Sequence, residues 1–77
     1  MQGVKIYPNP VTDELRIEGI SAGTEIRIVD ILGRETGHMV AGTKTETIAT
    51  TTWANGTYLL QLNGKDGKRM TATIVKQ

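Results

Sequence analysis

The chain has 77 residues, of which 38% are hydrophobic and 22% charged, and nine basic residues against eight acidic ones give a formal net charge of +1. A chain this short buries only roughly 60% of its unfolded surface and supports one small core. The basic residues are scattered along the sequence, which argues against nucleic acid as a partner. The absence of Cys excludes disulfides and thiolate metal sites. No apolar run reaches the roughly 18 residues of a membrane-spanning helix, so we expect no direct membrane insertion.

The first predicted strand ends at a rigid corner within the stretch VKIYPNP, residues 4–10. Apolar and polar residues alternate from Val4 to Tyr7, as in a half-buried strand. Pro8 and Pro10 then donate no hydrogen bond to a sheet, and each biases the residue before it toward an extended conformation. Taken alone, these residues indicate a corner that ends the strand, turns the chain and guards a sheet edge. The corner motif consists of Tyr7, Pro8, Asn9 and Pro10.

Alternation with a period of two recurs along most of the remaining chain, whereas helical periodicity does not. Leu15 and Ile17 alternate with charged residues, and Ile26 and Ile28 do the same. Leu59 interrupts the polar face of its segment, so we expect that strand to be central and covered on both faces. The predicted strands lie within residues 14–19, 24–30, 33–40, 43–50, 57–63 and 68–77.

Turn signals separate these segments. In DILG, residues 30–33, Asp30 is placed to accept hydrogen bonds from turn amides and Gly33 to adopt a positive φ, and NGKDGK at 63–68 contains two strong hairpin signals. Turn signals recur about every eight to twelve residues, and no strand alternates with a helical segment. The sequence therefore predicts an all-β fold, an immunoglobulin-like antiparallel β-sandwich of six or seven short strands.

The whole pattern resembles the C-terminal sorting domain (type A) of the type IX secretion system of Bacteroidetes. The resemblance covers residues 6–77. It rests on the YPNP corner, the LRI strand at 15–17, the turn at 30–34, the Gly-Thr-Tyr step at 56–58 and the apolar-basic tail at 74–76. This sequence departs from the family pattern at Thr73, where a Lys is often found, and at Trp53, where a Leu is more usual.

The resemblance implies a secretion signal without catalytic activity or cofactor. Such a domain directs its parent cargo protein from the periplasm across the outer membrane to the cell surface or the extracellular space, and a surface sortase then removes it. The implied partners are the type IX secretion machinery, its surface sortase and an N-terminal cargo domain. We therefore interpret residues 1–77 as one C-terminal domain excised from a larger secreted protein, with residues 1–3 as a linker or an added start and the cut at or before residue 3.

The resemblance places recognition at the Gly-Thr-Tyr step and the terminal strand. A strand that contains the chain end can lie at a sheet edge and offer unpaired amides and carbonyls to a partner strand. In the competing interpretation, Ile74 and Val75 simply close the sandwich. We expect the penultimate residue, Lys76, to be solvated. The predicted recognition residues are Gly56, Tyr58, Thr73, Ile74, Val75, Lys76 and Gln77.

An enzyme is not supported by the residues present. His38 is the only His, and without Cys there is no soft metal ligand. A metal site or a His-based nucleophilic relay would have to be assembled from one imidazole and scattered carboxylates. Asp13 and Glu14 are adjacent, so on a strand they point to opposite faces rather than forming an acid/base pair. Trp53 is interpreted as filling the end of the core, since one aromatic residue makes a poor sugar platform. The Asn-Gly-Thr sequence at 55–57 fits a glycosylation pattern, but a turn explains it better.

A different class of function stays open. A secreted enzyme can carry an immunoglobulin-like binding or adhesion module, or a fibronectin-like spacer, with the same architecture. Architecture alone does not separate these functions from a sorting signal. A ligand-binding module usually shows aromatic or acidic groups converging on one loop end. This sequence has few of them.

Overall fold

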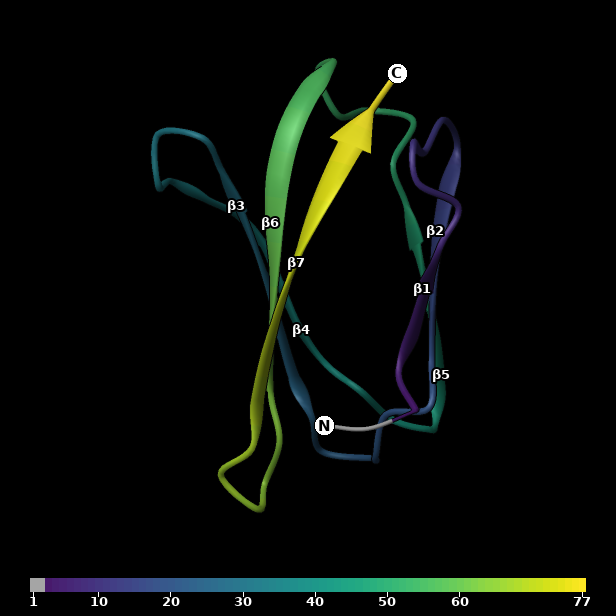
Figure 1. The fold of residues 1–77 in the computed structure, drawn as a ribbon, viewed down its shortest axis with the longest axis vertical. Coiled ribbons are helices and arrows are strands. Elements are labelled where there is room, and N and C mark those ends of the chain that lie inside the picture. The colour runs from purple at the N-terminus through teal and green to yellow at the C-terminus, as the bar shows by residue number, and fades with distance from the viewer. Residues whose placement is uncertain (1–2) are drawn as a thin grey trace.

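Seven strands form where the alternating pattern places them, in a computed structural model that describes residues 3–77 (Figure 1). They are β1 (Lys5–Tyr7), β2 (Glu14–Glu18), β3 (Glu25–Asp30), β4 (Glu35–Val40), β5 (Thr45–Ala49), β6 (Gly56–Asn63) and β7 (Arg69–Lys76). A three-stranded sheet has the order β1-β2-β5, a four-stranded sheet has the order β4-β3-β6-β7, and every strand pair is antiparallel. The all-β sandwich predicted from the sequence is thus confirmed. Within the described residues, no helix is long and apolar enough to span a membrane.

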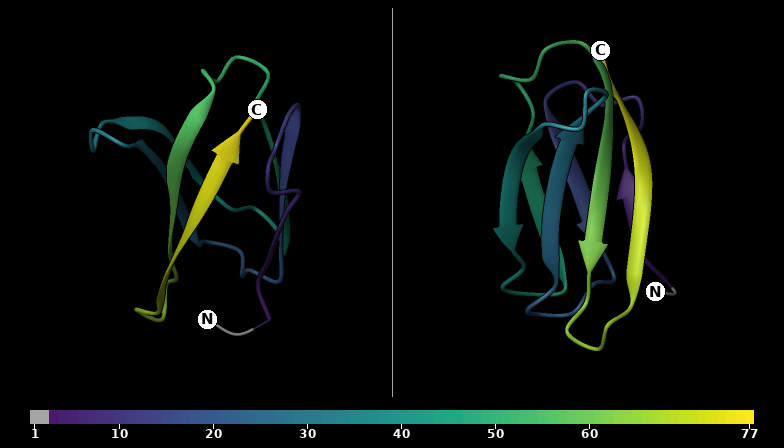
Figure 2. Two further views of the ribbon diagram at one scale, coloured as in Figure 1. Left: turned by 45° about the horizontal axis from the view of Figure 1, so that its top comes forward. Right: turned by 90° about the vertical axis from the view of Figure 1, so that its left-hand side faces the viewer.

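The core lies between the two sheets, which stand on opposite sides of the molecule in the left view of Figure 2, while the right view looks onto the four-stranded sheet. Period-two alternation turns one apolar set of each strand inward, and burial of that surface is the main driving force for the fold. Trp53 packs against the cluster from the loop before β6, as expected, and its ring centroid lies 4.7 Å from that of Tyr58. The side chains exposed by less than 2% include Val11, Leu15, Ile17, Ile26, Leu60, Leu62 and Ile74.

Strand β6 is central, with β3 on one side and β7 on the other, but only one of its faces is covered. Tyr58, Leu60 and Leu62 point into the core, whereas Leu59 is 36% exposed on the outer face. The expectation that this strand is covered on both faces is therefore wrong. A sandwich has only two layers, so no part of residues 3–77 is packed outside the four-stranded sheet. Leu59 is therefore an apolar side chain on a surface rather than a second core contact.

The YPNP corner carries the chain from one sheet to the other. Strand β1 pairs with β2 in the three-stranded sheet, and four residues after its end Val11 forms a parallel bridge with Lys76 of β7 in the four-stranded sheet. Both peptide bonds that precede the prolines are cis. Because proline donates no backbone hydrogen bond, regular pairing of β1 with β2 stops at this corner. The first strand segment is thereby divided between the two sheets.

Candidate functional site at the C-terminal end of the sandwich

The residues predicted to carry recognition gather at one end of the sandwich. Figure 1 shows the C-terminus, the start of β6, the loop before β2 and the loop after β5 at this end, while the loop after β2 and the loop before β5 lie at the opposite end. The corner at 7–10 lies against the last residues of β7, and the turn at 30–33 borders the first residues of β6. The fold thus brings together motifs that are far apart in the sequence.

The side chain of Asn9 forms the hydrogen bonds to β7 that the backbone of a neighbouring strand would otherwise form. Its side-chain Nδ2 donates to the carbonyl oxygen of Thr73 at 2.9 Å, and its Oδ1 accepts from the amide of Val75 at 2.9 Å. The carboxamide therefore reproduces the donor and acceptor pair that a neighbouring strand would present. We call residues 8–11, which carry Asn9 and Val11, the strap.

Val11 continues this pairing with its own backbone. Its amide donates to the carbonyl of Val75 at 2.8 Å, and its carbonyl accepts from the amide of Gln77 at 2.9 Å. β7 is an edge strand, as expected, but the strap occupies its outward-facing groups from Thr73 to Gln77. The expectation that this stretch offers unpaired amides and carbonyls to a partner strand is therefore wrong. The prediction that the corner guards a sheet edge applies instead, with Asn9 supplying the hydrogen bonds that the prolines do not.

Lys76 is buried, with 8% of its surface exposed, so the prediction that it is solvated is wrong. Side chains alternate along β7, so Lys76 shares the inward face with Ile74, which is 1% exposed. Its Nζ reaches the carbonyl oxygen of Gln77 at 3.1 Å, while its aliphatic stem fills the end of the sandwich. Alternation along β7 predicts this burial of Lys76 once Ile74 is known to face inward. Thr73, Val75 and Gln77 lie on the exposed side.

Gly56 and Tyr58 shape the start of β6. Gly56 has a φ of 145°, a conformation that favours glycine, although no atom lies within 4 Å of the position of an added Cβ. Tyr58 is 8% exposed, and its hydroxyl donates to the carbonyl oxygen of Ala54 at 2.7 Å. The tyrosine thus ties the loop before β6 to the core. Both residues support the shape of this end of the molecule.

Tyr7 fixes the other side of the corner to the three-stranded sheet. Its hydroxyl donates to the Glu18 carboxylate, which lies on the neighbouring strand β2. This hydrogen bond, together with desolvation and the negative charge of Glu18, raises the pKa of the Tyr7 hydroxyl above its ordinary value. The corner is thus held by a side chain at each end, Tyr7 toward β2 and Asn9 toward β7.

The Asp30 turn has the predicted hydrogen bonds. The Oδ1 atom of Asp30 accepts from the amides of Leu32 at 2.9 Å and Arg34 at 3.0 Å, and Oδ2 accepts from the Arg34 Nε at 2.8 Å. Gly33 has a φ of 81°, as expected from its position. Partial desolvation raises the pKa of the Asp30 carboxyl, but the Arg34 amide and guanidinium and the Leu32 amide lower it by more. The pKa of Asp30 therefore lies below its ordinary value.

We expect Asp30 to make stability sensitive to acid. A lowered folded-state pKa means that the carboxylate stabilises the fold above its unfolded pKa of about 3.9, and that this contribution is lost as the pH falls through the folded pKa. Urea unfolding midpoints measured from about pH 6 to about pH 2 should fall more steeply for the wild type than for Asp30→Asn, which keeps an oxygen for both amides. Parallel curves for the two proteins would contradict this prediction.

The Asp30 turn also presents two apolar side chains to solvent. Ile31 is 76% exposed and Leu32 is 72% exposed at the tip of the hairpin. Ile31, together with the outer face of β3, β6 and β7, borders a hollow of about 560 Å³. Leu32 lines a second hollow of about 270 Å³ beside the start of β6. Leu59 lies directly opposite Thr73 across the strand pair, and Val75, which is 37% exposed, lies opposite Thr57. We call this surface the apolar face; its residues are Ile31, Leu32, Thr57, Leu59, Thr73 and Val75.

The apolar face includes residues that sequence reasoning missed. The sequence predicts Thr73 and Val75 as recognition residues, but it predicts Ile31 and Leu32 only as part of a turn. Two consecutive large apolar residues between Asp30 and a turn glycine were the available signal, since loop tips are usually polar. Exposed apolar residues that adjoin one another are typical of interaction surfaces, whereas single ones are not.

The charged residues of the outer face are placed for ion pairs. His38 Nε2 lies 3.3 Å from the Glu25 carboxylate on the exposed sheet surface, and Arg27 pairs with Glu35 at 2.7 Å. Within residues 3–77 there is no group of three or more His, Asp and Glu side chains arranged to hold a metal ion. His38 thus belongs to an exposed group of polar side chains on the sheet surface.

Comparison of the sequence with models of known protein families identifies a matching family. A model of the secretion system C-terminal sorting domain matches residues 5–77. A search of curated proteins gave no match. The matched region begins in β1 and ends at the last residue, so it includes the strap, the Asp30 turn, the Gly56 step and the terminal strand.

Two solved structures share the fold. PorZ, described as an essential bacterial surface component of the type IX secretion system of Porphyromonas gingivalis, is 24% identical with a TM-score of 0.85, and the match covers 97% of this chain and 11% of PorZ. This chain therefore spans about a tenth of the length of PorZ. A DUF3244 family protein from Bacteroides vulgatus is 16% identical with a TM-score of 0.82, and the match covers 96% of this chain and 84% of that protein.

The second of these structures has an immunoglobulin-like β-sandwich fold, which confirms that part of the predicted fold class. At these identities the two structures establish the fold alone. The family follows from the sorting-domain model, which extends over nearly the entire sequence. On that evidence the chain belongs to the secretion system C-terminal sorting domain family, as the resemblance of its corner, turns and terminal strand predicted.

Proposed function

We propose that the domain is a sorting signal that directs a parent cargo protein across the outer membrane by the type IX secretion system. The observation that carries this proposal is the match of the sorting-domain model to residues 5–77. The fold shared with PorZ, a surface component of that system, is consistent with it. The cargo precedes the domain, passes through the periplasm and is released to the cell surface or the extracellular space, where a sortase removes the domain.

Cleavage before β1 is compatible with the fold. The proposed cut at or before residue 3 involves residues 1 and 2, which lie outside the described part of the chain, and Gly3, which is exposed. Among the described residues, Lys5 at the start of β1 is the first one paired within a sheet. A cut upstream of β1 therefore leaves the sandwich and its strap intact, so the domain can be removed without first being unfolded.

The structure supports a division of roles among the predicted recognition residues. Tyr58, Ile74 and Lys76 point inward and support the end of the sandwich. Thr73 and Val75 point outward and belong to the apolar face. We assign recognition by the secretion machinery to this face, because folded elements hold its apolar side chains in place and it contains part of the terminal strand. Gly56 at the start of β6 and Gln77 after the end of β7 belong to the backbone that supports this face.

Fusion of residues 1–77 behind a reporter with a signal peptide should place the reporter on the surface or in the medium of a type IX-competent bacterium. Without the domain, or in a strain that lacks the translocon, the same reporter should stay in the periplasm. Cell fractionation measures the distribution, and protease resistance of the fused domain checks that it is folded. Retention of a reporter whose domain is folded would contradict the proposed function.

A further inference from the structure

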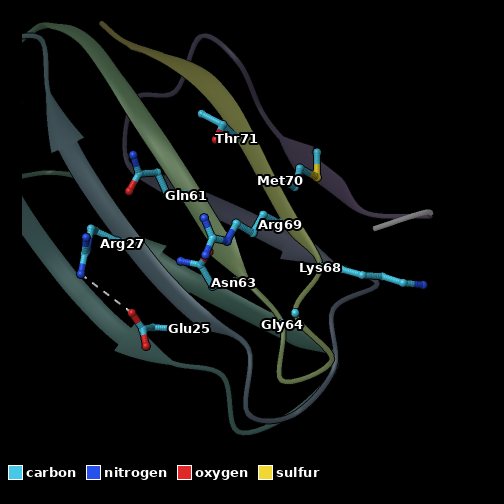
Figure 3. Close-up of a pocket in the computed structure, with 10 residues that line it drawn as sticks. Glu25, Arg27, Gln61, Asn63, Gly64, Lys68, Arg69, Met70 and Thr71 are labelled. Carbon is cyan, nitrogen blue, oxygen red and sulfur yellow. Dashed lines mark ion pairs between the residues drawn. The ribbon is translucent and has the colours of Figure 1, made fainter.

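A polar groove of about 480 Å³ crosses the outer face of the four-stranded sheet at the end away from the apolar face (Figure 3). The residues around it come from β3, β6, β7 and the turn between β6 and β7. Two Arg and one Lys line it together with one Glu, so cationic side chains outnumber acidic ones. The overall charge of the chain gave no sign of this local excess.

Strand pairing sets two rows of side chains across the groove. Arg27 on β3 lies opposite Gln61 on β6, which lies opposite Thr71 on β7. In the next row Glu25 on β3 lies opposite Asn63 on β6, which lies opposite Arg69 on β7. Neighbouring strands are about 4.8 Å apart and residues on one face recur about every 7 Å along a strand. Gln61, Asn63, Arg69 and Thr71 therefore surround a patch of about 5 by 7 Å.

The two arginines differ in their partners. Arg27 pairs with Glu35 at 2.7 Å and approaches Glu25 at 4.0 Å, the pair drawn in Figure 3. In residues 3–77 no ion pair engages Arg69, whose guanidinium reaches over β6 toward Asn63 in Figure 3. Lys68 points away from this group in the same view. Glu25 is two strand spacings from Arg69, about 10 Å, and is also engaged by His38 at 3.3 Å.

Side-chain amides and a hydroxyl accompany the cation of Arg69. The two carboxamides, Gln61 and Asn63, are half-buried, whereas Arg69 and Thr71 are exposed. Of the side-chain hydrogen bonds within the described chain, none involves these four groups. A planar guanidinium matches a carboxylate or phosphate with two parallel hydrogen bonds, and carboxamide and hydroxyl groups both donate to and accept from hydroxyls.

We propose that this groove binds an oxyanion carried on a hydroxyl-bearing group, as in a sugar acid or a sugar phosphate. Arg69 binds the anionic group, Gln61, Asn63 and Thr71 bind adjacent hydroxyls, and Arg27 adds positive charge from the neighbouring strand. A neutral sugar is a poorer ligand, because the groove has no aromatic ring for stacking. The groove shares no residue with the apolar face, although it adjoins the hollow beside that face through Arg27 and Gln61. Its existence does not depend on the proposed role in sorting.

Titration of the 15N-labelled chain tests this site by backbone amide shifts. The probes are glucuronate, glucose 6-phosphate, inorganic phosphate and glucose, all at the same ionic strength because exposed charges are screened by salt. We expect saturable shifts around residues 61–63 and 69–71 with both acidic sugars, weaker shifts with phosphate and none with glucose. Arg69→Gln should weaken binding of the acidic sugars roughly tenfold, as expected for the loss of a charge-assisted hydrogen-bonded pair.

Arg16→Gln is the matched control. Arg16 is exposed on strand β2 of the other sheet, where its side chain is 51% exposed and lies 3.6 Å from Glu18. This variant removes the same charge and should leave the titrations unchanged. The proposal is overturned if no probe gives saturable shifts, if Arg69→Gln and wild type bind equally, or if hexaglutamate binds more tightly than either acidic sugar. Export is not measured here, so the result is independent of the sorting function.

Discussion

Removal of Thr73–Gln77 is expected to unfold the domain and thereby abolish export. The deletion strips Ile74, which is 1% exposed, at a cost of about 1.5 to 3 kcal/mol. It also removes the buried stem of Lys76 and the partners of Asn9 and Val11, whose four hydrogen bonds join the strap to β7. Each such bond contributes about 0.5 to 1.5 kcal/mol net. Small domains have about 5 kcal/mol of stability at the low end, so the combined loss is comparable with the whole.

Chemical denaturation of the 77-residue and 72-residue chains measures this directly. Gln77→Ala is the control, because it keeps the backbone amide that donates to Val11 and removes only an exposed side chain. Lys76→Ala is unsuitable as a neutral control, since that side chain is buried. A truncated chain with a cooperative transition near the wild-type midpoint would show that the terminal strand is dispensable for folding. Loss of export in that truncated chain would then be a recognition defect.

Replacement of Ile31 and Leu32 together by Ser is expected to block export with little change in stability. The two side chains are 76% and 72% exposed, and surface substitutions of this kind usually change stability by about 0.5 kcal/mol or less. They supply the most exposed apolar surface of the apolar face, so a partner that buries this face loses much of its contact area. Secretion of the reporter fusion should fall about tenfold or more if the lost contact is worth at least about 1.4 kcal/mol.

Val40→Ser is the matched control for this variant. Val40 is 58% exposed, on the edge strand β4 and outside the apolar face. It should be exported at the wild-type rate, and denaturant midpoints should be close to wild type for both variants. Normal export of the Ile31→Ser/Leu32→Ser protein would remove recognition from the turn. Thr73 and Val75 would then be the next residues to test.

Local sequence patterns predict local features of this fold. Alternation at Leu15 and Ile17, or at Ile26 and Ile28, identifies strands because each strand has one buried face. The Asp30 turn is equally local, since all its hydrogen bonds lie within four residues along the chain. Such features depend on neighbours in sequence, and they are the ones that the sequence predicted in detail.

The long-range features were not accessible in the same way. The bonds of Asn9 to β7 join residues 64 and 66 positions apart, and no local pattern reveals that partner. Side chains alternate between the two faces of β7, so the burial of Lys76 follows only once Ile74 is known to face inward. The exposure of Leu59 depends on whether a third layer covers the sheet, which alternation within β6 does not determine.

The strap has a consequence for the order of events during synthesis. Asn9 and Val11 emerge from the ribosome long before Thr73, Val75 and Gln77, so the early segment has no partner until the last residues are available. Contacts between distant parts of a chain also slow folding, because a large loop must close first. A chain shortened by premature termination or by C-terminal proteolysis keeps β1 to β6 but has no strand on which the strap can close. In a protein that carries this domain at its C-terminus, the folded domain therefore marks a chain that has been made to its end.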